Sequence, residues 1–169
     1  NFEDHVELRN QLLSYHKMGN NDDYVDSLAS EIMEAFSGYL NGKPNGAGGI
    51  FRAGTGSAME YLFSAARVGA TPDGRKAGQP YGSSFSPAIT TKLEGPLSCI
   101  QSFTKFDMSK IINGGPLTME IHDTVFRNED GIRKVAQLVK GFIDLGGHQL
   151  QLNSINRDRL LDAQKHPED

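Results

Sequence analysis

Arg52 is the residue with the clearest capacity for ligand chemistry. The sequence predicts a short strand at about residues 49–52, so that Arg52 stands at its C-terminal end, just before a Gly-rich turn. In α/β sheets and barrels this end of a strand faces the ligand site. A guanidinium there can hold a carboxylate, sulfonate or phosphate through two parallel hydrogen bonds. Arg52 is therefore a candidate substrate-binding residue, and the alternative is a structural ion pair with a nearby Asp or Glu.

Three amide side chains form the second candidate group. Gln149, Gln151 and Asn153 alternate with leucines along a predicted strand at 148–154, so the amides share one face. If that face lines a barrel interior, the amides are buried and need partners. They could brace a neighbouring loop through its backbone or contact substrate. The alternative is the solvent side of an edge strand, and the residues alone leave both open.

Cys99 and a short polar cluster are weaker candidates. Cys99 lies between apolar neighbours, and a free cysteine there usually behaves as a small buried hydrophobic residue. Glu120, His122 and Asp123 follow a predicted strand and carry groups capable of acid-base chemistry. A capped corner between strand and helix is the better interpretation of that cluster.

Familiar catalytic motifs are missing from the sequence. The glycines at 46–49 and 54–56 suggest a phosphate-binding loop, but Met59 stands where the dinucleotide pattern requires a third glycine. A tight turn between strand and helix explains them better. There is no metal-ligand spacing, Walker A sequence or nucleophile elbow. The missing motifs weaken the case for a free-standing enzyme, and the sequence predicts no metal site and no bound cofactor.

The composition restricts the class of protein. The 169 residues suit one domain, and a net charge of -4 without a basic run excludes nucleic-acid binding. No apolar stretch is long enough to span a membrane, and the polar N-terminal residues do not resemble a signal peptide. A single cysteine suits a reducing compartment, so we expect a cytoplasmic location.

The elements that must position these side chains follow from periodicity. Residues 1–45 are predicted to form outer helices, one at 5–17 and one capped by Asn21. Apolar residues recur along the second helix at three- and four-residue spacing, which predicts a buried stripe. The stripe comprises Tyr24, Leu28, Ile32, Ala35, Phe36 and Tyr39.

The remaining residues, 46–169, alternate between strands and helices after a helix at about 57–67 and a long proline-containing loop at 69–96. This order indicates an α/β fold with parallel strand pairing. The predicted strands lie at 97–104, 116–121 and 148–154, and the predicted helices at 129–144 and 156–165.

Four stretches, in the same order along the chain, resemble the C-terminal part of glycyl radical enzymes, the family of pyruvate formate-lyase and the radical dehydratases. They read GNNDDYVD at 19–26, RAGTGSAM at 52–59, ATPDGRKAG at 70–78 and DAQKHPE at 162–168. Together they span most of the chain, from residue 19 to residue 168. Their details are closer to the dehydratase and lyase branch than to pyruvate formate-lyase itself.

The resemblance implies that residues 1–169 are a single segment of a ten-stranded α/β barrel with an outer helical layer. In the family the catalytic cysteine lies upstream of this segment and the radical glycine lies downstream, in an Arg-Val-x-Gly loop. Neither is assigned to a residue here, so the radical-glycine domain is expected to be absent and the chain inactive alone. The resemblance also favours the barrel interior for Gln149, Gln151 and Asn153.

The implied activity is radical cleavage of a C-C, C-O, C-N or C-S bond in a small metabolite. A glycyl radical starts it, installed by an activating enzyme that uses S-adenosylmethionine and an iron-sulfur cluster. The expected partners are the substrate, the activating enzyme, the remainder of the enzyme or a radical-carrying subunit, and a second copy in a homodimer.

Two alternatives remain open. The chain could be a natural short subunit that a radical-carrying partner completes, or a small anion-binding module that uses Arg52. A segment of a larger barrel predicts an exposed apolar surface and open strand edges.

Overall fold

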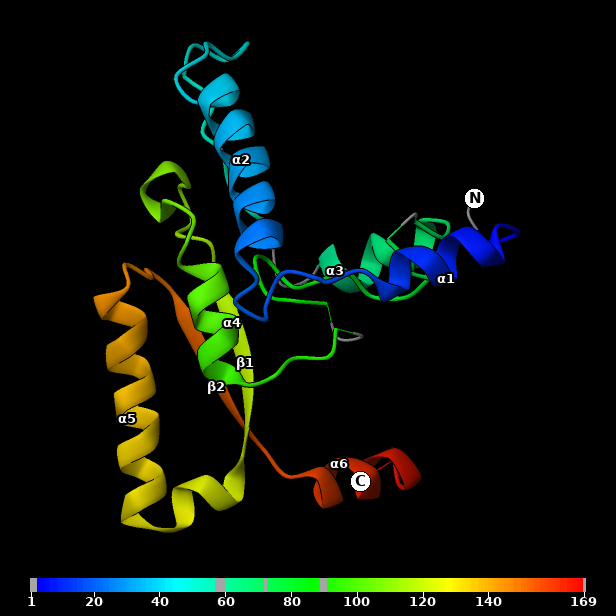
Figure 1. Ribbon diagram of the computed structural model, residues 1–169, viewed down its shortest axis with the longest axis vertical. Coiled ribbons are helices and arrows are strands. Elements are labelled where there is room, and N and C mark those ends of the chain that lie inside the picture. The colour runs from blue at the N-terminus through cyan, green and yellow to red at the C-terminus, as the bar shows by residue number, and fades with distance from the viewer. Residues whose placement is uncertain (1–2, 57–59, 72, 89–90, 169) are drawn as a thin grey trace.

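The computed structural model describes residues 3–56, 60–71, 73–88 and 91–168. Helices precede, separate and follow the two strands of one small sheet, and several helices reach outward from a compact centre (Figure 1). None of the helices in the described residues is both long and apolar enough to cross a membrane. The elements are α1 (Val6–Ser14), α2 (Asp23–Leu40), α3 (Glu60–Phe63), η1 (Ala65–Arg67), α4 (Pro96–Phe103), η2 (Met108–Lys110), β1 (Leu117–His122), η3 (Asp123–Arg127), α5 (Glu129–Asp144), β2 (Leu150–Ile155) and α6 (Arg157–Lys165).

The two strands pair in parallel, and α5 forms the crossover between them. Their register runs from Leu117 opposite Leu150 to His122 opposite Ile155. Asn128 caps α5 by accepting a hydrogen bond from the Gly131 N–H, as expected for an Asn at this position. The parallel pairing and the predicted elements at 116–121, 129–144, 148–154 and 156–165 are confirmed within one or two residues at most ends.

The core lies between α4, α5 and one face of the sheet. Leu117 and Met119 of β1 point into it, and the ring of Phe103 lies 5.1 Å from Phe85 and 5.9 Å from Phe142 between centroids. Gly147 lets the chain turn closely over Phe142, since a Cβ there would lie 2.3 Å from the ring. The buried cluster comprises Cys99, Ile100, Phe103, Phe106, Met108, Ile111, Leu117, Met119 and Phe142.

The predicted strand at 97–104 is wrong, because these residues form α4. Pro96 occupies the first turn, where a missing N–H costs nothing. The buried residues Cys99, Ile100 and Phe103 follow helical spacing, whereas Leu97 is 53% exposed. Apparent alternation over a short apolar run therefore concealed a helix that covers the sheet.

The predicted strand at 49–52 is reduced to a single antiparallel bridge between Pro44 and Ile50. Asn45 holds the turn between them, since its Oδ1 accepts hydrogen bonds from the Ala47 and Gly49 N–H groups. The tight turn therefore pairs these residues only once, and residues 49–52 do not form a strand. The predicted helix at 57–67 is described only from residue 60, where α3 and η1 lie, and residues 57–59 fall outside the described chain.

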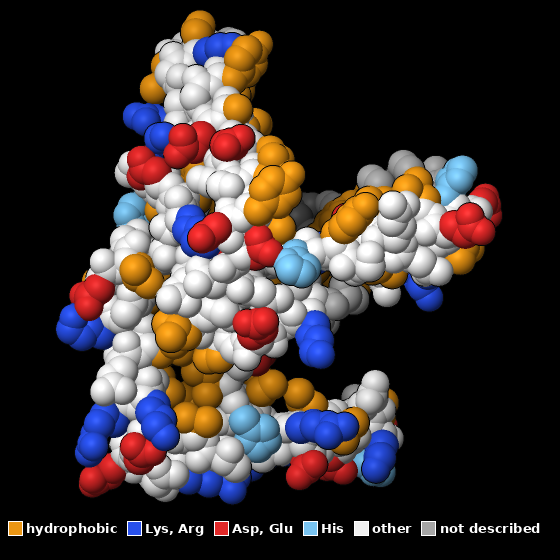
Figure 2. All heavy atoms as spheres, viewed as in Figure 1, with side chains coloured by type: hydrophobic (Ala, Val, Ile, Leu, Met, Phe, Trp, Pro, Cys, Tyr) orange, Lys and Arg blue, Asp and Glu red, His pale blue; other side chains and the backbone are white. Residues whose placement is uncertain are grey.

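The apolar stripe of α2 is not buried, contrary to the prediction. Tyr24 is 79% exposed and Ile32 is 61% exposed, and Figure 2 shows apolar side chains gathered along this helix. The buried residues of α2 are instead Asp26 and Ser37. Asp22, rather than Asn21, caps the helix by accepting hydrogen bonds from the Tyr24 and Val25 N–H groups.

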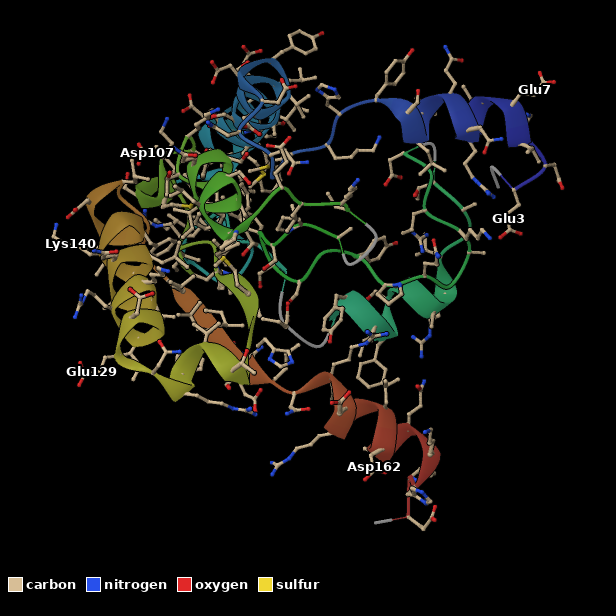
Figure 3. The ribbon with its side chains drawn as sticks, turned by 60° about the horizontal axis from the view of Figure 1, so that its bottom comes forward. Glu3, Glu7, Asp107, Glu129, Lys140 and Asp162 are labelled. Atoms are coloured by element: carbon tan, nitrogen blue, oxygen red, sulfur yellow. The ribbon has the colours of Figure 1, made fainter. Side chains whose placement is uncertain are left out.

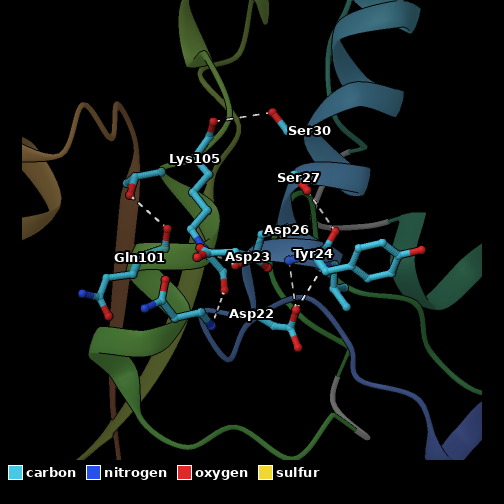
Figure 4. A network of polar contacts seen from close by, with 12 residues as sticks. Asp22, Asp23, Tyr24, Asp26, Ser27, Ser30, Gln101 and Lys105 are labelled. Atoms are coloured by element: carbon cyan, nitrogen blue, oxygen red, sulfur yellow. Dashed lines mark hydrogen bonds and ion pairs between the residues drawn. The ribbon is translucent and has the colours of Figure 1, made fainter.

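A polar contact joins α2 to the core (Figure 4). Lys105 Nζ donates to Asp26 Oδ2 at 2.9 Å and to Asp23 Oδ1 at 2.7 Å, and the Asp26 side chain is fully buried. The Asn21 N–H donates to Ser102 Oγ at 2.7 Å in the same region. The helix therefore meets the core through its polar side, which explains why its apolar side faces outward.

Arg75 organises the predicted long loop. Only 8% of Arg75 is exposed, and its guanidinium lies 4.6 Å from the centroid of the Tyr81 ring. The same guanidinium donates to four backbone carbonyls, so one side chain closes the loop on itself. The four carbonyls belong to Val68, Gly69, Lys76 and Gln79.

Candidate functional site

A cavity of about 1010 Å³ lies alongside β1, and we call it the β1 cavity. Residues from both faces of β1 line it, including Thr118 and Glu120 on one face and Met119 and Ile121 on the other. Successive strand residues point to opposite faces. A cavity lined by both faces must therefore wrap around the edge of the strand.

That edge of β1 pairs with no strand in the described chain, although residues 85–86 contact its first residues. The Leu117 N–H donates to the Gln149 carbonyl, whereas the next N–H, of Thr118, points the other way and donates to Ser86 Oγ at 2.8 Å. Because backbone groups alternate between the two edges, the N–H and C=O of Glu120 point away from β2. No further strand pairs with β1 in the described chain. The β1 cavity therefore offers backbone groups to an extended segment, and the open edge matches the expectation for part of a larger sheet.

The polar wall of the β1 cavity carries two of the three predicted amides. Gln151 lies opposite Thr118 and Asn153 lies opposite Glu120 in the parallel register. Gln151 Nε2 donates to Asn153 Oδ1 at 3.0 Å, which orients both amides. Gln149 precedes β2, is exposed and lies outside the cavity lining. The sheet thus presents Gln151 and Asn153, with Thr118 and Glu120, as one polar surface.

The opposite wall is apolar and contains Cys99. Val135 and Leu138 of α5 line it together with Met119. Cys99 is only 2% exposed, and burial, with a smaller contribution from the charge of Asp26, raises the pKa of its thiol to about 11. A protonated thiol is neither a nucleophile nor a metal ligand. The interpretation of Cys99 as a small hydrophobic residue is confirmed, although it lies on a helix rather than a strand.

The carboxyl end of the sheet forms a hydrogen-bonded corner. His122 Nδ1 accepts from the Thr124 N–H, which caps η3. Asp123 Oδ2 accepts from Arg127 at 2.8 Å and from Asn156 at 3.1 Å. The bond from Asn156, followed by that from Arg127, holds the pKa of Asp123 below its ordinary value. The capped-corner interpretation of His122 and Asp123 is confirmed.

Arg52 lies apart from this site. It is exposed and does not belong to the lining of the β1 cavity. The following residue, Ala53, is fixed by its N–H to Asn41 Oδ1 at 2.6 Å and by its carbonyl to the Ile112 N–H. The backbone beside Arg52 is therefore anchored while its side chain is accessible. Its role in binding substrate stays a prediction.

Two residues that sequence reasoning missed are important in this region. Arg75 lies in the ATPDGRKAG stretch at 70–78. Its position after a Gly in a turn does not indicate that its guanidinium donates to four backbone carbonyls. Asn156 precedes a predicted helix, so its capping role was readable, but its bond to Asp123 spans 33 residues and has no local signal. In the described parts of the chain, no three His, Cys, Asp or Glu side chains are placed to hold a metal ion.

Comparison with known families identifies two matching regions. The sequence model described as Glycine radical matches residues 82–169, which is more than half of the chain. The model described as Pyruvate formate lyase-like matches residues 1–62. The first match therefore begins within the predicted long loop at 69–96, and the second ends before that loop.

Curated relatives support the same assignment. The chain is 32% identical over 153 residues to trans-4-hydroxy-L-proline dehydratase of Clostridioides difficile, which covers 90% of this chain and 19% of that protein. It is 34% identical over 172 residues to the probable dehydratase YbiW of Escherichia coli (strain K12), covering 97% of this chain and 21% of that protein. The chain thus spans about a fifth of the length of these relatives.

A solved structure agrees in three dimensions. The B12-independent glycerol dehydratase from Clostridium butyricum, in its glycerol-bound form, superposes with a TM-score of 0.89 at 32% identity. The superposition covers 99% of this chain and 21% of that chain, so the outward helices keep the same arrangement as in a much longer protein. On its sequence and its fold, this chain belongs to the glycyl radical enzyme family.

Proposed function

We propose that the chain is a wall segment of a glycyl radical lyase that removes water from a small hydroxylated metabolite. The observation that carries the proposal is the likeness, over at least 90% of the chain, to proteins named as dehydratases. In such an enzyme the sheet would continue at the open edge of β1 into a ten-stranded barrel. The chain alone would be inactive, because no residue in it is assigned as the catalytic cysteine or the radical glycine.

The chain's own contribution would be positioning. Gln151 and Asn153 would face the barrel interior, where their amides can donate to and accept from substrate hydroxyls or a neighbouring backbone. Arg52 would bind an anionic group through its planar fork. The apolar wall on the far side of β1 would keep water from the core of the barrel.

The match of residues 82–169 to the Glycine radical model supports radical chemistry in the intact enzyme. A glycyl radical, installed by an activating enzyme that uses S-adenosylmethionine, supplies the hydrogen abstraction that starts such reactions. Within this segment Cys99 is 2% exposed and belongs to the hydrophobic core, which supports a packing role for it rather than a radical-carrying one.

The test is an anaerobic assay of the intact enzyme after activation. Glycerol and trans-4-hydroxy-L-proline are the first substrates, because the relatives named above act on them by name. We expect the enzyme to remove water from a hydroxylated compound. Mass spectrometry of the product would detect this loss. Cleavage of only C-N or C-C bonds would place the enzyme in another lyase class and contradict the dehydratase assignment.

A further inference from the structure

The direction of α6 is not fixed by packing. None of its residues is buried, and Leu160 and Leu161 are 56% and 41% exposed. Figures 1 and 3 show α6 reaching away from the sheet, with Asp162 at its outer side. A nine-residue helix is also too short to be stable in water without help from its ends.

One side chain at the start of α6 supplies two kinds of bond. Asn156 Oδ1 accepts from the Asp158 N–H at 2.9 Å and from the Arg159 N–H at 3.2 Å, which caps the helix. Its Nδ2 donates to Asp123 Oδ2 at 3.1 Å, at the end of the neighbouring strand. An amide can do both because it carries an acceptor and two donors, whereas an aspartate can only accept.

The acceptor on the other strand is itself held in place. Arg127 donates to the same Asp123 oxygen from within η3. His122 Nδ1 lies 3.2 Å from the other oxygen, Asp123 Oδ1, a contact that is an ion pair only when the imidazole is protonated. In the tautomer that accepts the Thr124 N–H, Nδ1 carries no hydrogen to offer to Asp123. Asp123 is therefore directed toward Asn156 and Arg127 by the fold of the corner.

We propose that the Asp123–Asn156 contact, which we call the α6 latch, sets the direction in which the chain leaves β2. Asp123 and Asn156 are positioning residues that act through α6. The latch ties the ends of two parallel strands, and it places whatever follows α6 relative to the β1 cavity. Any effect of the latch on dehydratase activity rests on the proposed function, whereas its effect on the direction of α6 does not.

The test measures a distance between α6 and the body of the protein. Spin labels are placed on cysteines introduced at the exposed positions Gln137 of α5 and Gln164 of α6, and double electron–electron resonance gives the distance distribution. Cys99 is buried with a raised thiol pKa, so it resists labelling. The otherwise unchanged chain is expected to give one narrow distribution.

The variant Asn156→Asp keeps the helix cap, because a carboxylate also accepts from the first-turn N–H groups. It replaces the latch with two carboxylates that repel each other. We expect loss of the single narrow distance. The double variant Asp123→Asn with Asn156→Asp reverses donor and acceptor, and we expect it to restore the narrow distribution.

The matched control is Asn128→Asp, since the Asn128 side chain accepts the capping bond from the Gly131 N–H and shows no bond to a neighbouring strand among the described residues. It should leave the distance unchanged. Asp123→Ala removes the latch without altering the α6 cap, so it should broaden the distance distribution. It provides the test if Asn156→Asp fails to fold. A narrow distribution in Asp123→Ala, or no recovery in the double variant with helix content intact by circular dichroism, overturns the latch. An intact enzyme without dehydratase activity would leave this result untouched.

Discussion

The buried carboxylate of Asp26 shows how single side chains decide the stability of this segment. Its side chain is fully enclosed, and Lys105 Nζ at 2.9 Å provides its charge partner. Asp26 Oδ1 is buried without a hydrogen-bond partner among the described residues. A buried charge with one good partner depends strongly on that partner.

Replacement of Lys105 should therefore be costly. Lys105→Met is expected to lower the free energy of unfolding by about 3 kcal/mol, because it leaves Asp26 buried and unpaired. Urea unfolding measures the change. Lys134→Met is the matched control: its pair with Asp130 is exposed on α5 and screened by solvent, so this change should cost much less than Lys105→Met. Equal effects of the two changes would contradict a special role for Asp26.

Arg52 carries the one substrate-binding prediction made from sequence. In the intact enzyme, Arg52→Lys keeps the charge but loses the planar fork, so we expect a higher KM for an anionic substrate with a smaller change in kcat. Steady-state kinetics would show it. Arg133→Lys, at an exposed position on α5, serves as control. Unchanged kinetics in Arg52→Lys would reduce Arg52 to a structural role.

At the scale of elements, local signals were sufficient for residues 116–165. Asn128 and Asn156 mark the starts of α5 and α6, and the alternation of leucines with amides marks β2. The two failures differ in cause. Residues 97–104 form a helix although a short apolar run there also fits the period of a strand. The stripe of α2 is exposed because periodicity alone does not say which side of a helix is covered. Alternation along the strand grouped Gln151 and Asn153 on one face, whereas the bond between Asn156 and Asp123 joins residues far apart in the sequence and has no local signal.

The cap of α2 should give the protein a measurable acid sensitivity. The hydrogen bond with His16, followed by that from the Val25 N–H, holds the pKa of Asp22 below its ordinary value. A lowered folded-state pKa adds stability above the unfolded value of about 3.9, and this is lost as the pH falls through the folded pKa. Asp22→Asn still caps but does not titrate, so urea unfolding between pH 6 and 3 should show a shallower acid decline. An identical decline would show that Asp22 is not responsible.

The apolar stripe of α2 should contribute little to the stability of the chain alone. Ile32 and Phe36 are 61% and 48% exposed, so Ile32→Ser with Phe36→Ser should change the unfolding free energy by no more than about 0.5 kcal/mol per site. Phe103→Ala, in the core, should cost about 3–5 kcal/mol. Binding of a hydrophobic dye should fall in the serine variant. A large loss of stability would show that the stripe is already covered.

On the scale of the whole molecule, the exposed stripe, the open edge of β1 and the outward helices have a common explanation. The chain spans about a fifth of its relatives' length, yet 99% of it superposes on one of them with a TM-score of 0.89. Its shape is therefore that of a piece seated in a larger body. Surfaces that face solvent here would be interior surfaces there, which is why an apolar stripe can persist on α2.

The most direct measurement is electron paramagnetic resonance of the intact polypeptide after anaerobic activation. The proposed function predicts the signal of a carbon-centred glycyl radical, its loss on exposure to oxygen, and parallel loss of dehydratase activity. Dehydratase activity that persists in air, with no radical signal at any stage, would contradict the proposal.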